Sequence, residues 1–207
     1  MSGTFKNISG TKKNGIVIAT KLEGKPFVTQ LGLKKISSKP LIYAKEDLYL
    51  IISGIGKVRA SLATSFLIKQ FQVKNILNLG AAGSTTQKYH LGDIRQIDRV
   101  IEYDLYKPKF LQPDLFLDFL NASLATQDKP VFDPLEREKL NLEADLVDME
   151  GAAVVRATHF WRVKVFLFKI ISDTPSHTDS KQIIKNMREV SADLAIFFKN
   201  HILSKLS

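Results

Sequence analysis

The feature of this sequence that most limits its fold is an alternation of short apolar runs with segments of helical periodicity. Four runs have the length and composition of buried strands: residues 15–20, 48–53, 75–79 and 163–172. Helices are expected over residues 57–71, 150–161 and 179–203. Strands that alternate with helices predict an α/β protein, a three-layer α/β/α sandwich around a central mixed sheet, in a single domain covering residues 1–207.

The last of these helices has the clearest pattern. Its apolar residues are separated by four, three, four and three positions, a spacing that only a helix keeps on one side: Ile183, Met187, Val190, Leu194 and Phe197. In the helix over 57–71, Val58, Leu62 and Phe66 recur every four residues. We expect these three side chains to form the apolar face of that helix.

The remaining segments carry weaker patterns. A strand is expected over 93–101, then a loop up to Pro113 and a strand within 115–126. Residues 80–84, Gly-Ala-Ala-Gly-Ser, are expected to form a loop whose small side chains let backbone N–H groups approach a small molecule. Residues 1–14 are expected to be a flexible or edge segment.

Several classes of protein are disfavoured by what the sequence lacks. It contains no cysteine, so disulfides, a thiolate nucleophile and cysteine-based metal sites are ruled out. Its four histidines are scattered, and neither a metal nor a cofactor is expected. The turn at 54–57, Gly-Ile-Gly-Lys, is followed by Val58 and Arg59, which fit neither a P-loop nor a dinucleotide fingerprint. It is either a tight strand-to-helix turn or one that also approaches a ligand.

The net charge of +9 raises the question of nucleic-acid binding. The cations are dispersed with no run of five, which is typical of a solvated lysine surface, so a nucleic-acid partner is not expected. The most apolar stretch, residues 163–171, is short and interrupted by Lys164 and Lys169, so no membrane span is predicted. Residues 1–15 lack the apolar core of a secretory signal, and we expect a cytoplasmic protein.

Three carboxylates stand where predicted strands end. Glu23 follows the first strand, Glu150 opens a helix and Asp173 follows the last strand. Each alone has an ordinary interpretation, as a surface glutamate, a partner of the helix dipole and a turn aspartate. Together they would lie along one edge of the sheet, where ligands bind in α/β proteins. His177 is close enough in sequence to reach the mouth of such a site, whereas His159 is expected to be packed.

The motifs around these positions resemble the purine nucleosidase and phosphorylase superfamily, above all the 5′-methylthioadenosine/S-adenosylhomocysteine nucleosidases. SGIGK, DMEGAA and ISD at these separations are jointly specific, although each alone is not. The motifs follow one another in the order of the family: A-x-x-x-E at 19–23, SGIGKVRAS at 53–61, N-x-G-x-A-G at 78–83, LGDI at 91–94, VDMEGAA at 147–153 and ISD at 171–173.

The resemblance implies a homodimer and a role for each matched residue. Glu23 would be the general base that activates water, and Asp173, oriented near Ser172, would donate a proton to purine N7. Glu150 would bind the ribose 2′- and 3′-hydroxyls. The substrate-binding residues that the resemblance implies are Glu150, Met149, Ser172, Val131, Gly80, Ala81 and Gly83. Met149 would line the ribose site, and Val131 would contact the base through its backbone.

The chemistry of these roles is coherent. Breaking a ribose–purine bond builds positive charge on the sugar, which carboxylates stabilise, and negative charge on the base, which a proton neutralises. The phosphorylase branch carries an arginine before its glycine segment, and residues 77–80 have none, which favours water as the acceptor. We therefore predict hydrolysis of a 5′-modified purine nucleoside of the methylthioadenosine/S-adenosylhomocysteine type.

Three alternatives stay open at this point. The segment 104–126 is shorter than in typical family members, so the substrate is alternatively a nucleoside with a bulkier 5′ group, as in futalosine or aminodeoxyfutalosine hydrolases. The others are a purine nucleoside phosphorylase and a non-catalytic nucleoside-binding relative.

Overall fold

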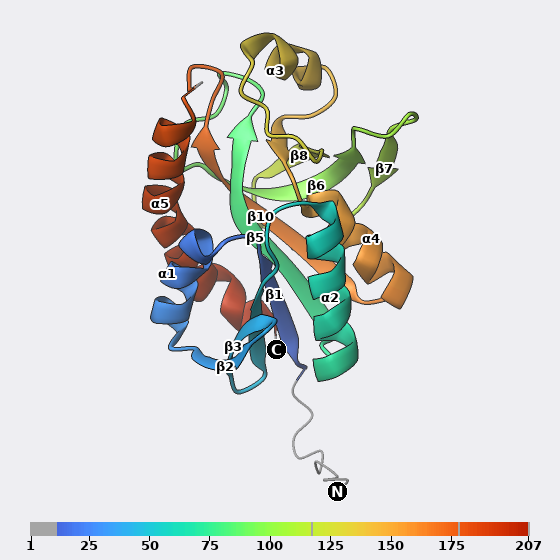
Figure 1. Cartoon of the computed structure of the whole chain (residues 1–207), viewed down its shortest axis with the longest axis vertical. Helices are drawn as coiled ribbons and strands as arrows, with labels where there is room; N and C mark the ends of the chain where they lie inside the picture. The colour runs from blue at the N-terminus through green and yellow to red at the C-terminus, as the bar shows by residue number, and fades with distance from the viewer. Residues whose placement is uncertain (1–11, 117, 178, 207) are drawn as a thin grey trace, which may run out of the picture.

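A central sheet runs through the whole computed structural model, which describes residues 12–116, 118–177 and 179–206 (Figure 1). Its middle strand β1 (Asn14–Ile18) is parallel to both β4 (Leu48–Ile52) and β5 (Asn75–Ser84). On the other side of β5 lies β10 (Lys164–Asp173), also parallel. The predicted strands near these positions are confirmed. Most of the predicted flexible or edge segment, residues 1–11, lies outside the described residues.

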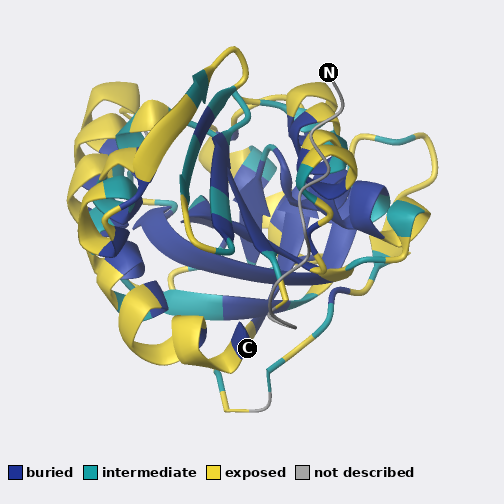
Figure 2. Cartoon of the chain, turned by 90° about the horizontal axis from the view of Figure 1, so that it is seen from below, coloured by how far each residue is buried: buried dark blue, intermediate teal, exposed yellow. Residues whose placement is uncertain are grey.

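Helices cover both faces of this sheet (Figure 1). On one face α1 (Lys21–Leu31) packs against α5 (Ser180–Phe197). On the other face α2 (Lys57–Phe71) packs against α4 (Gly151–Trp161). The strands between them are buried, and the outer sides of the helices are exposed (Figure 2). This arrangement confirms the predicted three-layer sandwich and the three predicted helices.

At the end that carries the site, the sheet closes on itself. β10 pairs with β6 (Ile94–Glu102), β6 with β8 (Asn121–Thr126), β8 with β9 (Leu146–Asp148), and β9 returns to β5. The circuit mixes parallel and antiparallel pairs, as the predicted mixed sheet requires. Because one continuous sheet joins β1 to β10, we propose that the chain forms a single domain.

The prediction of a loop over residues 80–84 is wrong, because these residues form the second half of β5. The backbone from Gly80 to Ala82 pairs with β10, and Gly83 and Ser84 pair with β9. Strand β10 therefore satisfies one side of this segment, while on the other side the Glu23 side chain accepts from the backbone N of Ala81 and β9 pairs with Gly83 and Ser84. The small side chains in this segment make room for the groups packed against it.

The predicted apolar face of α2 is also wrong. Val58 and Leu62 are 71% and 67% exposed, and Phe66 is partly exposed. The buried side of α2 carries Ala60 and Leu67 instead, and small residues there let the helix approach α4 closely. The spacing of apolar residues predicted the helix correctly, but two faces of α2 share that spacing and only one meets the core.

Some elements were not predicted. They are α1, the hairpin of β2 (Lys34–Ser38) and β3 (Leu41–Lys45), β7 (Lys109–Leu111) and α3 (Pro134–Asn141). Gly24 and Pro26 are unfavourable in a helix, so the sequence did not indicate α1. A capping box at its first turn starts the helix nevertheless.

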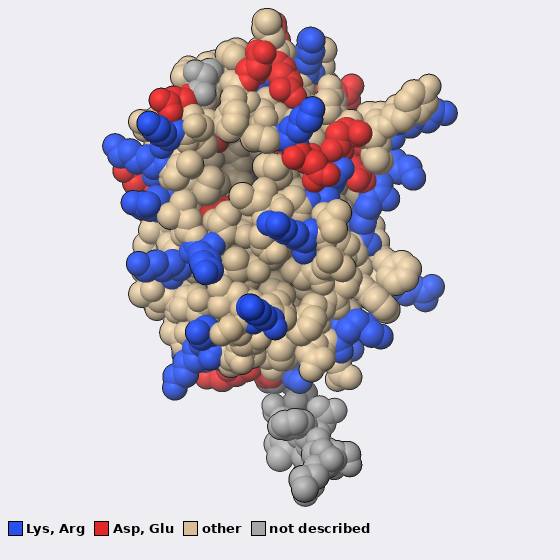
Figure 3. Space-filling view, viewed as in Figure 1, with Lys and Arg blue, Asp and Glu red and all other residues tan. Residues whose placement is uncertain are grey.

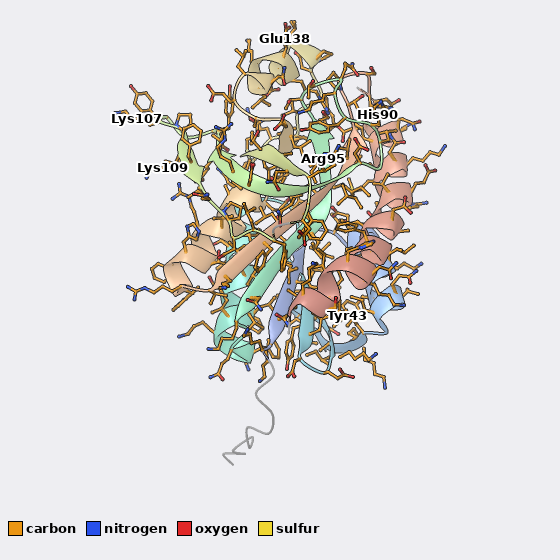
Figure 4. All side chains as sticks on the ribbon, turned by 180° about the vertical axis from the view of Figure 1, so that it is seen from behind. Tyr43, His90, Arg95, Lys107, Lys109 and Glu138 are labelled. Atoms are coloured by element: carbon orange, nitrogen blue, oxygen red, sulfur yellow. The ribbon has the colours of Figure 1, made fainter. Side chains whose placement is uncertain are left out.

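The strand β7 forms a hairpin with β6 that projects from the body of the molecule. Lys107 and Lys109 point outward from it (Figure 4). Among the described residues, no helix is both long and apolar enough to cross a membrane.

Candidate active site

A cavity of about 360 Å³ lies where the carboxyl ends of β1, β5 and β10 meet α5. This size suits a small molecule. Figure 3 shows a hollow on this side of the molecule with acidic residues inside it, while lysines and arginines are spread over the surrounding surface. Eight of the nine residues predicted from the sequence line the cavity: Glu23, Ala81, Gly83, Val131, Met149, Glu150, Ser172 and Asp173. The ninth, Gly80, lies behind Glu23, since a Cβ there would come within 2.9 Å of Glu23 Oε1.

Glu23 is positioned by the start of α1. Thr20 caps this helix, and both its backbone N (3.1 Å) and its Oγ1 (2.6 Å) donate to Glu23 Oε2. The other oxygen, Oε1, accepts from the backbone N of Ala81 at 3.0 Å. The side chain is buried. Helix α1 and strand β5 thus fix both oxygens of this carboxylate at the wall of the cavity.

Glu150 occupies the N-cap position of α4. Its Oε1 accepts from the backbone N of Gly56 at 2.9 Å, at the start of α2. Burial and the nearby Asp148 carboxylate raise the pKa of Glu150 to about 7, although Lys169 and the Gly56 hydrogen bond act in the opposite direction. The turn at 54–57 therefore does approach the site, and Ile55 lines the cavity as well.

A buried ion pair supports the start of α4. Lys169 Nζ lies 2.8 Å from Asp148 Oδ2, and both side chains are almost fully buried. Asp148 also accepts from the Oγ1 of Thr126 (2.6 Å) and from the backbone N of Gly151 (2.9 Å). Every charge in this group therefore has a partner, which buried charges require. The pair holds the turn that presents Glu150 to the cavity.

Asp173 is the last residue of β10, opposite Gly83 of β5. Ser172 Oγ donates to its Oδ1 at 2.7 Å, so the predicted orientation of Asp173 near Ser172 is present. Its other oxygen, Oδ2, forms an ion pair with Arg137 of α3, which also lines the cavity. Sequence reasoning missed Arg137, because its partner lies 36 residues away and no motif surrounds it.

The histidine expectations are not met. His177 is absent from the cavity lining, and its Nδ1 accepts from the backbone N of Thr174 at 3.2 Å. His159 is exposed rather than packed, with its Nε2 3.1 Å from the Gln112 carbonyl oxygen. Ile183 and Met187, predicted only as the apolar face of α5, form part of the cavity wall. Among the residues that the structure describes, no three His, Cys, Asp or Glu side chains gather as a metal-binding group.

The geometry places three carboxylates around one cavity, each held by different partners. Such a set can accept a proton at one point, bind hydroxyls at another and donate a proton at a third. The sequence model of the phosphorylase superfamily matches residues 13–124 and 121–202. The chain belongs to the phosphorylase superfamily.

Two named relatives are similar to the chain over most of its length. The 5′-methylthioadenosine/S-adenosylhomocysteine nucleosidase of Buchnera aphidicola subsp. Schizaphis graminum is 26% identical, with 79% of this chain and 83% of the relative covered. The aminodeoxyfutalosine nucleosidase of Campylobacter jejuni is 25% identical, with 74% and 81% covered.

Solved structures share the phosphorylase-superfamily fold of this chain. The Helicobacter pylori 5′-methylthioadenosine/S-adenosylhomocysteine nucleosidase matches with a TM-score of 0.83 at 21% identity, over 92% of this chain and 97% of that one. The futalosine hydrolase of Helicobacter pylori strain 26695 matches with a TM-score of 0.81 at 21% identity, over 91% and 96%.

Proposed function

We propose that this chain hydrolyses the N-glycosidic bond of a 5′-modified purine nucleoside, of the methylthioadenosine/S-adenosylhomocysteine type, and releases the free base. The observation that carries this proposal is the single cavity lined by Glu23, Glu150 and Asp173. The names of these two relatives, one a nucleosidase of this type and the other an aminodeoxyfutalosine nucleosidase, support the same reaction. The enzyme is then an N-ribosyl hydrolase.

Glu23 acts as the general base in this proposal. Its two oxygens accept hydrogen bonds from Thr20 and Ala81, so the carboxylate is held still while a water molecule approaches it. Taking a proton from that water would generate the nucleophile that attacks the anomeric carbon of the ribose. A fixed orientation of this kind lowers the entropic cost of the reaction.

Glu150 binds the ribose 2′- and 3′-hydroxyls, beside Met149. Both residues line the cavity, and the hydrogen bond from Gly56 uses only one Glu150 oxygen. Carboxylates near the sugar also stabilise the positive charge that develops there as the bond breaks. The Glu150 carboxylate thus contributes both to binding and to the transition state.

Asp173 donates the proton to purine N7 from Oδ2, while the Ser172 hydroxyl stays on Oδ1. Because Oδ2 pairs with Arg137 in this structure, the proposal requires that the bound base displaces the guanidinium from Oδ2 and that the carboxyl first takes up a proton from solvent. The base would lie against Val131, whose backbone contacts it, and beside Ala81 and Gly83 of β5, while the absent side chain of Gly80 leaves room for the Glu23 carboxylate. A purine protonated at N7 leaves as a neutral molecule, which makes it a better leaving group.

The acceptor is proposed to be water rather than phosphate. The resemblance places the phosphate-binding arginine of the phosphorylase branch just before the glycine segment, and Leu77, Asn78 and Leu79 occupy that stretch here. Arg137 lines the cavity, but it is already bonded to Asp173, Ser84 and Val131.

Base release decides between these reactions. The purified chain is incubated with methylthioadenosine, S-adenosylhomocysteine, aminodeoxyfutalosine or inosine, with and without phosphate, and the free base is measured. Release without phosphate is the expected result, with a loss of about 10²–10⁴-fold in Glu23→Gln and Asp173→Asn. The matched control is Glu143→Gln, at an exposed glutamate. Release that depends on phosphate would indicate a phosphorylase, and full activity of either variant would contradict the role given to it.

A futalosine-type substrate is the second candidate, and one observation favours it. None of the described residues in the segment 103–120 lines the cavity, so this segment does not close over the end of the site where a 5′ group would extend. A bulkier 5′ group then has space. Comparing rates for methylthioadenosine and aminodeoxyfutalosine tests this directly, since a wall at that end would favour the smaller substrate.

We propose that the chain forms a homodimer through the exposed side of α2. Ile55, Val58, Leu62 and Phe66 place apolar side chains in solvent along one side of this helix and the turn before it. A continuous apolar surface of this kind is typical of a protein–protein contact. Leu62→Glu should halve the molar mass measured by light scattering, whereas Ile36→Glu, at an exposed isoleucine of β2, should not. A cytoplasmic location stays a prediction.

A further inference from the structure

Lys57 has no role in the reaction proposed above, although it belongs to the turn that contacts Glu150. Its side chain is 14% exposed, and its Nζ lies near three carboxylates, at 3.3 Å from Glu102 Oε1, 2.5 Å from Asp104 Oδ1 and 3.7 Å from Asp128 Oδ2. Lysine is seldom buried to this extent unless its charge is paired. Glu102 ends β6 and Asp128 follows β8, so Lys57 joins the start of α2 to two other segments.

The amino end of α2 has no side-chain cap of its own. Its N-cap residue is Gly56, which offers no acceptor to the free N–H groups at the start of the helix. Two carboxylates from elsewhere in the chain accept from these groups instead. Glu150 Oε1 accepts from the backbone N of Gly56 at 2.9 Å. Asp128 Oδ1 accepts from the backbone N of Lys57 at 3.1 Å, so the contacts that hold Glu150 and Asp128 are neighbours in one turn.

The turn before α2 depends on such outside contacts. Gly54 and Gly56 have φ values of +87° and +101°, in a region that glycine enters freely, so the residues of the turn do not fix its shape by themselves. Asp128 contacts the turn twice, because its Oδ1 accepts from the backbone of Lys57 and its Oδ2 lies near the ammonium group. Asp128 is itself held, since its backbone N donates to Asp104 Oδ2 at 3.0 Å.

The charge of Lys57 keeps these segments together. Burial lowers the pKa of Lys57, but the hydrogen bonds with Asp104 and Glu102 raise it above its ordinary value overall, so the ammonium stays charged. Without this charge three carboxylates would remain with one cation, Arg156, which pairs with Glu102. Asp104 and Asp128 would then repel each other. We expect the turn and the segment at Asp128 to move apart as a result.

We propose that Lys57 is a positioning residue that determines how well Glu150 binds the ribose hydroxyls. Gly56 donates to one Glu150 oxygen and leaves the other for the ribose, so a shift of the turn changes where that second oxygen lies. Lys57 is absent from the lining of the cavity, and it therefore acts through Glu150 and not on the substrate. The inference rests on the proposed function and adds a residue on which recognition of the sugar depends.

Two nucleosides that differ by one hydroxyl test the proposal. For 5′-methylthioadenosine and its 3′-deoxy analogue, kcat/KM is measured in phosphate-free buffer. The parent chain should favour the nucleoside with both hydroxyls by about 10-fold or more, as expected for a hydrogen bond to a charged group. In Lys57→Met this preference should fall by about 5-fold or more, because Glu150 no longer meets the hydroxyls in the right place. The preference is a ratio, so it does not depend on how much of the variant is folded.

Two further variants serve as controls. Lys57→Arg keeps the positive charge and should retain more of the preference than Lys57→Met does. Lys35→Met, at an exposed lysine of β2, should keep the preference of the parent. A lysine that only stabilised the fold would lower kcat/KM for both nucleosides by the same factor and leave the preference unchanged.

The outcomes separate this proposal from the proposed function. A parent that does not distinguish the two nucleosides, an unchanged preference in Lys57→Met, or an equal loss in Lys57→Arg overturns the role of Lys57 while hydrolysis itself stands. If the parent cleaves neither nucleoside, hydrolysis of this substrate is contradicted. Equilibrium binding of the same two nucleosides then tests Lys57 alone, and it also decides where only Lys57→Met is inactive. Tighter binding of the nucleoside with both hydroxyls that Lys57→Met weakens supports the proposal, and any other binding result overturns it.

Discussion

Replacing Glu150 by Gln should make the folded chain more stable at pH 8 while impairing its activity. Burial and Asp148 raise the pKa of Glu150 from 4.5 to about 7, so the folded protein binds this proton more tightly than the unfolded chain does. The associated stability is fully present below pH 4.5 and is lost as the pH rises through about 7. Glutamine has the same shape and cannot ionise, so the variant avoids that loss.

The size of the effect follows from the pKa. At about 1.4 kcal/mol for each pKa unit, the ionised Glu150 side chain lowers the free energy of unfolding by roughly 3 kcal/mol at pH 8. For a chain of this length that corresponds to about 6–12 °C in Tm. At pH 5 most of the difference is absent, because the folded-state carboxyl is still protonated. This loss in the free energy of unfolding fits a functional role, since the Glu150 carboxylate is proposed to bind the ribose.

Urea denaturation of the parent and of Glu150→Gln at pH 5 and pH 8 measures this difference. Glu189→Gln, at an exposed glutamate of α5, serves as the control and should show no such change with pH. In the parent, kcat/KM should rise with pH through about 7 as Glu150 ionises. A stability difference between Glu150→Gln and the parent that is the same at both pH values would refute the reasoning.

Three further substitutions test how the site is held. Gly83→Ala places a Cβ 2.7 Å from Asp173 Oδ2, and the displaced carboxyl should cost about 10²-fold in kcat with the circular dichroism spectrum unchanged. Lys169→Met leaves Asp148 buried without its cation, and urea denaturation should show a loss of about 3–5 kcal/mol. Thr20→Ala removes the cap of α1, and should cost about 1 kcal/mol in the same assay together with part of the activity, while Thr20→Ser retains both.

The sequence predicted a helix or strand well where the spacing of apolar residues and the residues at the ends of the segment indicated the same element. The helix α2 begins at Lys57 and ends at Phe71 as expected, because a strand and a glycine turn precede it. Which side of α2 is buried could not be predicted, since Val58 and Leu62 are larger and more apolar than Ala60 on the buried side. Close packing against α4 selects the small residue, and that contact is invisible in a local pattern.

The sequence predicted those residues of the site that stand at the ends of strands or belong to recognisable motifs. Glu23, Glu150 and Asp173 stand beside strands whose ends meet, so their convergence follows from the topology. The buried partners were not predictable in the same way. Arg137 reaches Asp173 from a short helix that the sequence did not indicate, and residues 80–84 looked like a loop because small residues suit a turn as well as a crowded strand.

Strand β5 contacts both of the carboxylates that are proposed to act as base and acid. Ala81 anchors the Glu23 carboxylate through its backbone, and Gly83, two residues on, lies opposite Asp173. Two residues of a strand span about 7 Å and face the same way. The spacing of residues along β5 therefore contributes to the separation between the carboxylates proposed as base and acid. Inserting one residue between positions 81 and 83 would make the β5 residues at these two contacts face opposite ways, so that one of the two carboxylates would lose its contact with β5.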